Sequence, residues 1–321
     1  MNVMVVLVIV VALAVALLAA WAASKSWGLR NVVARWVVGV GGALLTLAAA
    51  AVAVVLCLGL YRLRNQDDHP IRNIEVQASA AALDRGEHLA KACAGCHANN
   101  RKPPLSGNDE ENFLEGLGVL HPPNLTPGGS LADVSAGRIA RAIREGVGID
   151  GRPLLIMPSP FFHAMSDEDV AAIIAYLRSQ PDEDNEVPAR AIGPFATLLI
   201  GAGMFPLAVQ APIEKKIGPP DHDDEKAWGE YTATIMACGE CHGLDFKGKP
   251  EGNGPGGPDI AHYADKWTDQ EWIDTIRTGV DPTGAKLKDM PWKEYSEALS
   301  DDELAAMRAY IRTFAKPAKD K

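Results

Sequence analysis

Two copies of the pentapeptide Cys-x-x-Cys-His constrain this chain more than any other feature. They run from Cys93 to His97 and from Cys238 to His242. In this pattern both thiols can add across the vinyl groups of a haem, and the histidine that follows is then held against the iron as its proximal ligand. The sequence therefore predicts two covalently bound haems. The attaching thiols are Cys93, Cys96, Cys238 and Cys241, and the iron ligands are His97 and His242.

Two other interpretations of the cysteine pairs are a redox dithiol of the thioredoxin type and half of a zinc site. The first expects a strand followed by a helix, which the Pro- and Gly-rich flanks do not suggest. Neither accounts for a histidine in the same place twice. The fifth cysteine, Cys57, lies in an apolar run and is predicted to act as a small hydrophobic residue. No cysteine is then left for a disulfide framework.

The first 61 residues contain no Asp or Glu and carry two apolar runs, Val3–Trp21 and Val37–Tyr61. Each run is near or above the ~20 residues that cross a hydrocarbon core. The segment between them, Ser24–Arg35, carries three positive charges, which the positive-inside rule places in the cytoplasm. We therefore predict a membrane anchor of two transmembrane helices over residues 1–64, with both of its ends facing outward.

A cleaved signal peptide ending near Ala22 is the alternative to the two-helix anchor. Its amino-terminal region lacks the usual Lys or Arg. Cleavage would leave a single span with Arg30 and Arg35 on its outer side, which the positive-inside rule disfavours. The two-helix anchor is therefore the preferred prediction.

The chain is acidic, with a formal net charge of −10. Residues 62–321 hold all 41 acidic residues and all but three of the 31 Lys and Arg residues. A surface of this sign argues against nucleic-acid binding. It favours protein partners that present basic patches, with an association that weakens as the salt concentration rises.

The part that follows the anchor contains an internal duplication. Residues 143–147 match residues 276–280 at an offset of 133, and the Met-Pro steps that begin at Met157 and Met290 keep that offset. The two Cys-x-x-Cys-His motifs are offset by 145, so the first copy carries about twelve extra residues after its motif. The duplication predicts two units of similar fold.

Each copy ends in a predicted helix. Ser166 and Ser300 open these helices in a capping-box pattern, and apolar residues then recur at helical spacing. Upstream, Gly86 and Gly229 lie on the helical approach to each Cys-x-x-Cys-His motif, where a glycine lets another helix come close. A unit of this size buries a modest core, and a large flat apolar cofactor helps to complete it.

The order of helix, Cys-x-x-Cys-His, Pro-Asn-Leu-like loop, helix, Met-Pro step and terminal helix resembles class I cytochrome c. The likeness covers residues 75–185 and 221–317, with an apolar linker at 186–220. It implies an all-α fold, with two transmembrane helices followed by two tandem class I cytochrome c domains. The implied crossings of the first and last helices pair Gly86 with Tyr176 and Gly229 with Tyr310.

A low-spin electron-transfer haem needs a protein ligand at its sixth position, and Met157 and Met290 are the candidates. Thioether sulfur is a soft donor that favours Fe(II), and the axial methionine of the family falls at this place. Met165 falls opposite Leu299, which cannot ligate iron, so Met165 is interpreted as a packing residue. Three histidines could also be distal ligands, but none recurs in the other copy: His121, His163 and His262.

Two further pairs of residues are candidates for contact with the haems. Pro123 and Pro258 occupy the position whose backbone carbonyl, in the family, accepts the hydrogen bond of the proximal imidazole. Prolines in loops are also ordinary turn formers. Arg144 and Arg277 either neutralise haem propionates or are solvent-facing helix residues, and the sequence favours neither interpretation.

A third apolar stretch, Ile192–Ile213, lies between the two copies. Its length permits a membrane span, but one crossing would put the second Cys-x-x-Cys-His motif on the opposite side from the first, where haem attachment is not expected. Pro194 and Pro206 also weaken a straight span. We predict that this stretch lies against the bilayer or a partner.

The leading functional hypothesis is a membrane-anchored dihaem cytochrome that passes single electrons and is not itself an enzyme. The resemblance places it in the bacterial inner membrane, in contact with lipid, with the haem domains facing the periplasm or the cell exterior. The alternatives are a dihaem peroxidase, in which one iron offers an open site, and an anchoring cytochrome subunit of a periplasmic dehydrogenase. Donor and acceptor stay open among a quinol-oxidising complex, a dehydrogenase, a terminal oxidase and a photosynthetic reaction centre.

Overall fold

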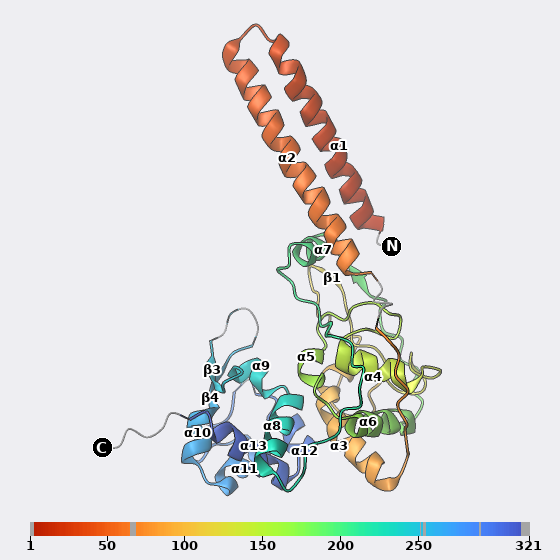
Figure 1. Cartoon of the computed structure of the whole chain (residues 1–321), viewed down its shortest axis with the longest axis vertical. Coiled ribbons are helices and arrows are strands. Elements are labelled where there is room, and N and C mark those ends of the chain that lie inside the picture. Colours follow the sequence, from red (N-terminus) through yellow and green to blue (C-terminus); the bar gives the residue numbers. More distant parts are fainter. Residues whose placement is uncertain (1–2, 65–68, 251, 253–254, 289, 316–321) are drawn as a thin grey trace, which may run out of the picture. The chain divides into compact units, whose positions relative to one another are not determined.

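The computed structural model of the chain describes residues 3–64, 69–250, 252, 255–288 and 290–315. Helices make up most of its regular structure, so the predicted all-α class is confirmed (Figure 1). The chain divides into two compact units. The membrane unit combines Met1–Gln66, Glu111–His121 and Pro188–Leu207, and the helical unit combines Asp67–Glu110, Pro122–Val187 and Ala208–Lys321.

A helical hairpin forms most of the membrane unit. α1 (Val3–Lys25) and α2 (Val32–Arg62) are joined through the short 3-10 helix η1 (Ser26–Gly28). The two long helices pack side by side, and the Thr46 hydroxyl lies 3.3 Å from the Ala16 carbonyl oxygen (Figure 1). Both are long and apolar enough to cross a membrane, and most of their side chains face outward. The two predicted apolar helices are therefore confirmed.

Part of the predicted apolar linker belongs to the membrane unit. α7 (Pro194–Gly201) packs against the end of α2, where the Arg62 guanidinium donates to the Ile200 carbonyl at 2.8 Å. Eight helical residues are about 12 Å long, far short of a bilayer. In the described part of the chain, α1 and α2 alone have the length and hydropathy of a membrane-crossing helix, and Ile192–Ile213 does not.

The helical unit contains the two sequence repeats, and the helices of the first repeat recur in the same order in the second, which also has α10 (Ile260–Lys266). The first repeat comprises α3 (Ala80–His97), α4 (Ala136–Glu145), α5 (Ser159–Phe162) and α6 (Asp167–Ser179). The second comprises α8 (Glu225–Ile235), α9 (Cys238–His242), α10 (Ile260–Lys266), α11 (Asp269–Thr278), α12 (Trp292–Ala298) and α13 (Asp301–Arg312). These helices fall within the predicted limits 75–185 and 221–317. The limits themselves and the linker 186–220 stay predictions, and residue 317 lies outside the described residues.

Two short antiparallel ribbons were not predicted. In the membrane unit β1 (Gly118–Val119) pairs with β2 (Ala191–Ile192), and in the second repeat β3 (Lys247–Lys249) pairs with β4 (Gly257–Asp259). Strands of two or three residues are too short to show an alternating pattern in the sequence.

The first helix of the second repeat is interrupted, unlike its counterpart. α3 runs continuously through the first Cys-x-x-Cys-His motif to His97. In the second repeat α8 ends before the motif and α9 restarts at Cys238, because Ala237 adopts a left-handed conformation with φ 55°. The second motif therefore lies on a helix of its own.

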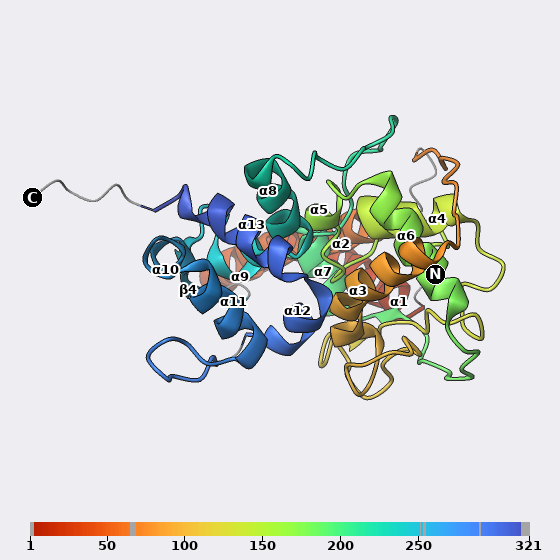
Figure 2. The same ribbon diagram turned by 90° about the horizontal axis from the view of Figure 1, so that it is seen from below.

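The first and last helices of each repeat cross at the predicted glycines. A Cβ atom at Gly86 would lie 2.0 Å from the Ala172 carbonyl oxygen, and one at Gly229 would lie 1.9 Å from the Ala306 carbonyl oxygen. No side chain fits at such a distance, so the helix backbones touch here. Figure 2 shows α3 beside α6 and α8 beside α13. The predicted crossing glycines are confirmed, and Gly86 also meets Tyr176 as predicted, whereas the atoms nearest to a Cβ at Gly229 belong to Ala306 and Met307.

The last helices supply the apolar residues at the centre of the helical unit. Ile174 of α6 and Leu304 and Ile311 of α13 are completely buried. The buried apolar side chains of the two repeats form one continuous cluster. Ser166 and Ser300 cap α6 and α13, as predicted, although only α13 has the reciprocal capping box.

Candidate haem sites

The first Cys-x-x-Cys-His motif occupies the last turn of α3. There the His97 imidazole is oriented by a backbone hydrogen bond, with its Nδ1 3.0 Å from the Pro123 carbonyl oxygen. Burial lowers the pKa of His97, although the Pro123 contact opposes this effect. A neutral imidazole that donates through Nδ1 presents Nε2 as a lone-pair donor, which is the form that binds iron.

The second motif reproduces this arrangement on different secondary structure. His242 lies on α9, and its Nδ1 is 2.9 Å from the carbonyl oxygen of Pro258, which lies on β4. The pKa of His242 is likewise lowered, chiefly by burial. Both prolines thus stand where the resemblance placed them, and in both repeats the Nε2 atom is left for another partner.

No disulfide competes for the thiols of either motif. None of the five cysteines is joined in a disulfide, and Cys57 is exposed on α2. Burial raises the pKa of both Cys93 and Cys238 to about 12, which keeps these thiols protonated. Among the described residues no group of three or more His, Cys, Asp or Glu side chains could hold a metal ion. This donor set does not fit a zinc site and does fit covalent attachment of a haem.

The two candidate axial methionines occupy the same local structure. Met157 and Met290 are both partly buried and stand just before a short helix. In each case the methionine carbonyl accepts a hydrogen bond at 2.8 Å from the amide two residues later. Met165 and its counterpart Leu299 are both 3% exposed and lie in the apolar core. These positions support the interpretation of Met165 as a packing residue.

Arg144 and Arg277 donate hydrogen bonds to equivalent groups in the two repeats, a backbone carbonyl and an aspartate at the start of the last helix. Arg144 is 2% exposed and donates to the Met165 carbonyl at 3.0 Å and to the Asp167 carboxylate at 2.7 Å. Arg277 donates to the corresponding groups of the second repeat, the Leu299 carbonyl at 2.8 Å and the Asp301 carboxylate at 2.6 Å. The solvent-facing interpretation is therefore wrong for Arg144. Both arginines tie the end of the methionine loop to the start of the last helix.

The aspartates at these positions were missed by the sequence analysis. Asp167 and Asp301 each begin a last helix and stand ten or eleven residues after the candidate methionine. In the sequence they stand only within a capping pattern. The signal that could have identified them is that an arginine and an aspartate recur together in both copies.

The three histidines without a counterpart lie in different surroundings. His163 Nδ1 is 3.1 Å from the Arg144 carbonyl oxygen, so His163 contacts the backbone of the arginine described above. His262 is exposed near the start of α10 and meets the Tyr263 ring edge to face. His121 belongs to the part of the chain assigned to the membrane unit.

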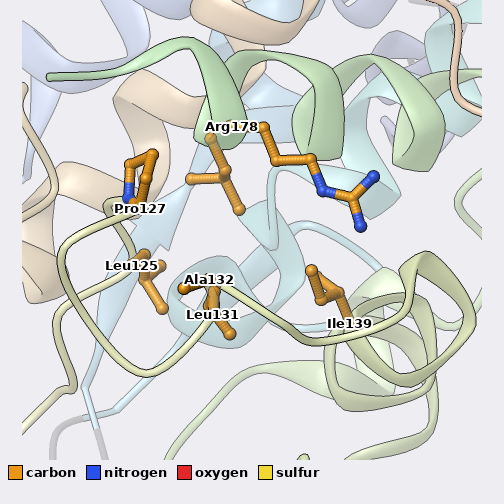
Figure 3. Close-up of a pocket in the computed structure, with 7 residues that line it drawn as sticks. Leu125, Pro127, Leu131, Ala132, Ile139 and Arg178 are labelled. Carbon is orange, nitrogen blue, oxygen red and sulfur yellow. The ribbon is translucent and has the colours of Figure 1, made fainter. Parts of the chain in front are cut away.

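An apolar hollow of about 200 Å³ opens beside the Pro123 loop of the first repeat. Figure 3 shows loop residues such as Leu125 and Leu131 on one side and Arg178 of α6 on the other. The remaining lining residues are Pro127, Ala132, Ile139 and Leu177. The hollow is smaller than a typical ligand pocket of roughly 300–1,000 Å³.

Comparison with known proteins gives a consistent set of relatives. The chain is 26% identical to the fructose dehydrogenase cytochrome subunit of Gluconobacter japonicus, over 85% of this chain and 60% of the relative. It is 31% identical to the gluconate 2-dehydrogenase cytochrome c subunit of Pantoea cypripedii, over 52% of this chain and 39% of the relative. It is 27% identical to the alcohol dehydrogenase (quinone), cytochrome c subunit of Gluconobacter oxydans (strain 621H), over 59% of this chain and 42% of the relative.

The chain thus spans 39% to 60% of the length of these three relatives. The family model for cytochrome c matches residues 83–181 and 230–315, which is more than half of the chain. Each matched region contains one Cys-x-x-Cys-His motif and one histidine bonded to a proline carbonyl. The chain therefore belongs to the cytochrome c family.

Proposed function

We propose that this chain is the electron-transfer subunit of a membrane-bound dehydrogenase and carries two covalently bound haems. The observation that carries the proposal is the repeated bond from the motif histidine to a proline carbonyl, at 3.0 Å and 2.9 Å. This bond orients each imidazole for a metal and fixes its tautomer. Relatives that are cytochrome subunits of dehydrogenases supply the class of complex.

Each proposed group of residues has its own task at the iron. When bound, each haem supplies one-electron chemistry between ferrous and ferric iron. The two thiols of each motif would hold the macrocycle by thioether bonds, and His97 and His242 would ligate the iron through Nε2. The carbonyl oxygens of Pro123 and Pro258 accept a hydrogen bond from Nδ1–H and raise the basicity of the imidazole. Met157 and Met290 would supply soft sulfur donors to the iron, which would favour the reduced state and exclude oxygen and peroxide.

Arg144 and Arg277 act in this proposal through the loop that each one holds. Their donors reach the carbonyl and carboxylate groups at the start of the last helix. A methionine on a mobile loop would exchange with water or an external ligand. Fixing the end of the loop therefore keeps the proposed sulfur ligand in place.

The proposed location is the bacterial inner membrane, with α1 and α2 as the two spans. The basic segment between them faces the cytoplasm, which places both repeats and their haems in the periplasm. The apolar surface of both helices supports anchoring in lipid. The exposed Phe195 and Met204, on and just after α7, suit contact with the same bilayer.

The three relatives belong by name to dehydrogenases of fructose, gluconate and alcohol. Similar cytochrome subunits thus occur in dehydrogenases that act on different substrates. This supports the view that another subunit selects the substrate. We propose that the donor is the catalytic subunit of a dehydrogenase and that this chain has no substrate chemistry of its own. The acceptor stays open among the respiratory and photosynthetic partners named above.

Purification of the full chain from native membranes tests the proposal. The expected result is a complex in which a dehydrogenase subunit accompanies the chain, whose intact mass includes two haems. Pyridine haemochrome analysis should then give two haems that acid acetone does not extract. A chain that purifies alone and turns over peroxide would favour the peroxidase alternative. A mass short of two haems would contradict the dihaem assignment.

A further inference from the structure

Five polar side chains from the two repeats meet where the last helix of each repeat begins. They are Arg85 of α3, Ser166 and Asp169 at the start of α6, Tyr231 of α8 and Glu303 of α13. We call this group the helix-start network. Its members are separated by up to 218 residues of sequence.

Arg85 joins the two repeats by bonding one carboxylate from each. Its guanidinium donates to Asp169 through two nitrogens, at 2.9 Å and 3.1 Å, and to Glu303 through a third, at 2.5 Å. It also lies 5.8 Å from the centre of the Trp228 ring. A planar fork with five donors can hold two carboxylates in fixed directions, which a lysine cannot do.

Tyr231 makes the second connection between the repeats. Here a side chain of the second repeat donates to a carboxylate of the first. Its hydroxyl donates to the Asp169 carboxylate at 2.7 Å and accepts from the Ser166 amide at 3.0 Å. Burial, and then the Asp169 charge, raises the pKa of Tyr231, so the phenol keeps the proton that it donates. The second repeat thus supplies a hydrogen bond to the first turn of α6.

The two acceptor carboxylates occupy equivalent positions in the two repeats, and each is bonded by a side chain of the other repeat. Asp169 and Glu303 are the third residues of α6 and α13, and each accepts a bond from the first helix of the opposite repeat. The donors themselves are not repeated. Arg85 corresponds to Trp228, and Tyr231 corresponds to His88. The connection is therefore specific to the way these two copies meet and is not a property of either copy alone.

Most of the network is buried, which makes its geometry demanding, although the Arg85 side chain is 26% exposed. Asp169 and Glu303 are each 6% exposed, and Ser166 is completely buried. A buried charge without its partner costs more than the pair contributes, so such networks favour one arrangement over its alternatives. Without such a contact, two linked domains are expected to move relative to each other.

Apolar contacts accompany the network close to the proposed haem sites. Phe161 of α5, four residues after Met157, lies against the second Cys-x-x-Cys-His motif, with its ring 3.7 Å from where a Cβ of Gly239 would stand. α12 packs beside α3, as Figure 2 shows. The methionine loop of one repeat and the attachment motif of the other therefore meet at the same surface.

We infer that the helix-start network locks the two repeats in a single mutual orientation and that Arg85 and Tyr231 are positioning residues for electron transfer between the haems. The inference rests on the proposed function in that each repeat carries a haem. Electron transfer slows steeply with distance, so a fixed orientation keeps the rate between the two haems independent of motion in the connecting chain.

Distance measurement between two spin labels tests the orientation directly. The labels are attached by Asp133→Cys in the first repeat and Asp265→Cys in the second, both exposed positions, in full-length protein that carries Cys57→Ser. Double electron–electron resonance is recorded on reduced protein, because low-spin ferrous haem is diamagnetic. The test variants are Tyr231→Phe, which removes only bonds between the repeats, and Arg85→Met with Tyr231→Phe. Arg138→Met, at an exposed arginine of α4, is the matched control.

The expected result is one narrow distance distribution in the parent and in Arg138→Met, broadened in Tyr231→Phe and broadened further in the double variant. Haem content and absorption spectra are expected to stay unchanged in Tyr231→Phe. A distribution that stays narrow in Tyr231→Phe and in the double variant would overturn the inference, and so would a broad distribution in the parent. If the double variant does not fold, Tyr231→Phe alone decides. Missing haem would contradict the proposed function but not the measured orientation.

Discussion

Two arginines form ion pairs with Asp167. Its carboxylate accepts hydrogen bonds from Arg72 at 2.8 Å and from Arg144 at 2.7 Å. Burial raises the pKa of Asp167, but the bonds from Arg72 and Arg144 outweigh this and hold the pKa below its ordinary value of 3.8. Because the folded protein binds the proton less tightly, ionised Asp167 stabilises the fold above about pH 4. This contribution is lost as the pH falls through the folded pKa.

Asp167→Asn is therefore expected to lower the free energy of unfolding at pH 7 by about 1.5–3 kcal/mol, the usual value of hydrogen bonds to a charged group. The difference from the parent is expected to shrink below about pH 4, where the parent carboxylate also becomes protonated. Denaturant unfolding at several pH values measures both effects, with Asp133→Asn as the control at an exposed carboxylate. A deficit that does not change with pH would contradict the assigned role of the charge.

Met157 and Met290 are the residues that distinguish a carrier from an enzyme. If both ligate iron, the oxidised protein shows a near-infrared sulfur-to-iron charge-transfer band, and each single Met→Ala variant loses about half of it. Each variant also gains high-spin character and binds cyanide or carbon monoxide at one haem, because a ligand position has been opened.

The matched control for this prediction is Met165→Leu, since Leu299 already occupies the equivalent position of the second repeat. The band is expected to survive in that variant. Loss of the band in Met165→Leu together with its retention in Met157→Ala would reverse the assignment. A parent protein without the band would favour a histidine ligand such as His163.

At the scale of elements, the helix crossings have the least tolerance for added volume. Gly86→Ala and Gly229→Ala would each force a methyl group against a backbone carbonyl of the last helix. Separation of the helices is expected to cost about 1–3 kcal/mol or more, which overpacking of a core typically costs. Thermal unfolding measures the loss. Gly218→Ala is the control, because no atom lies within 4 Å of the added carbon; equal effects at all three positions would refute the close-contact explanation.

The lengths of the helices in the membrane unit predict on which side of the bilayer each connecting segment lies. Thiol labelling of Lys25→Cys, Pro188→Cys and Lys216→Cys in intact cells is expected to place residue 25 in the cytoplasm and the other two in the periplasm. The reason is that α7 is too short to cross between residues 188 and 216. Accessibility of residues 188 and 216 from opposite sides would contradict this topology.

Local patterns and the duplication made much of this arrangement predictable. The Cys-x-x-Cys-His motifs, the caps at Ser166 and Ser300 and the crossing glycines are short-range signals, and each appears twice. Contacts between distant segments were not predictable. Nothing near Arg85 in the sequence identifies Glu303, and the packing of α7 on α2 depends on tertiary structure. The helix break at Ala237 was also missed, because alanine is a good helix former and tertiary structure overrides its preference.

At the scale of the whole molecule, the acidic charge sets how partners are found. The chain has a formal net charge of −10, with all its acidic residues after the first membrane segments. Raising the ionic strength from about 0.1 M to 1 M shortens the screening length from about 10 Å to 3 Å. The second-order rate of reduction by a basic redox partner is therefore expected to fall by about tenfold or more. Stopped-flow measurement tests this, with a small uncharged reductant as the control; a rate unaffected by salt would contradict it.

The acceptor for each motif histidine is a main-chain oxygen, at residue 123 in one repeat and at residue 258 in the other. Every amino acid carries such an oxygen, so no single codon change at either position removes the acceptor; it can only shift the loop. When the gene segment for this unit is duplicated, each copy therefore keeps the contact, and a point mutation does not remove its acceptor. Selection is then free to diversify the outer side chains of each copy, and a duplicated carrier can acquire new partners without first repairing its two centres.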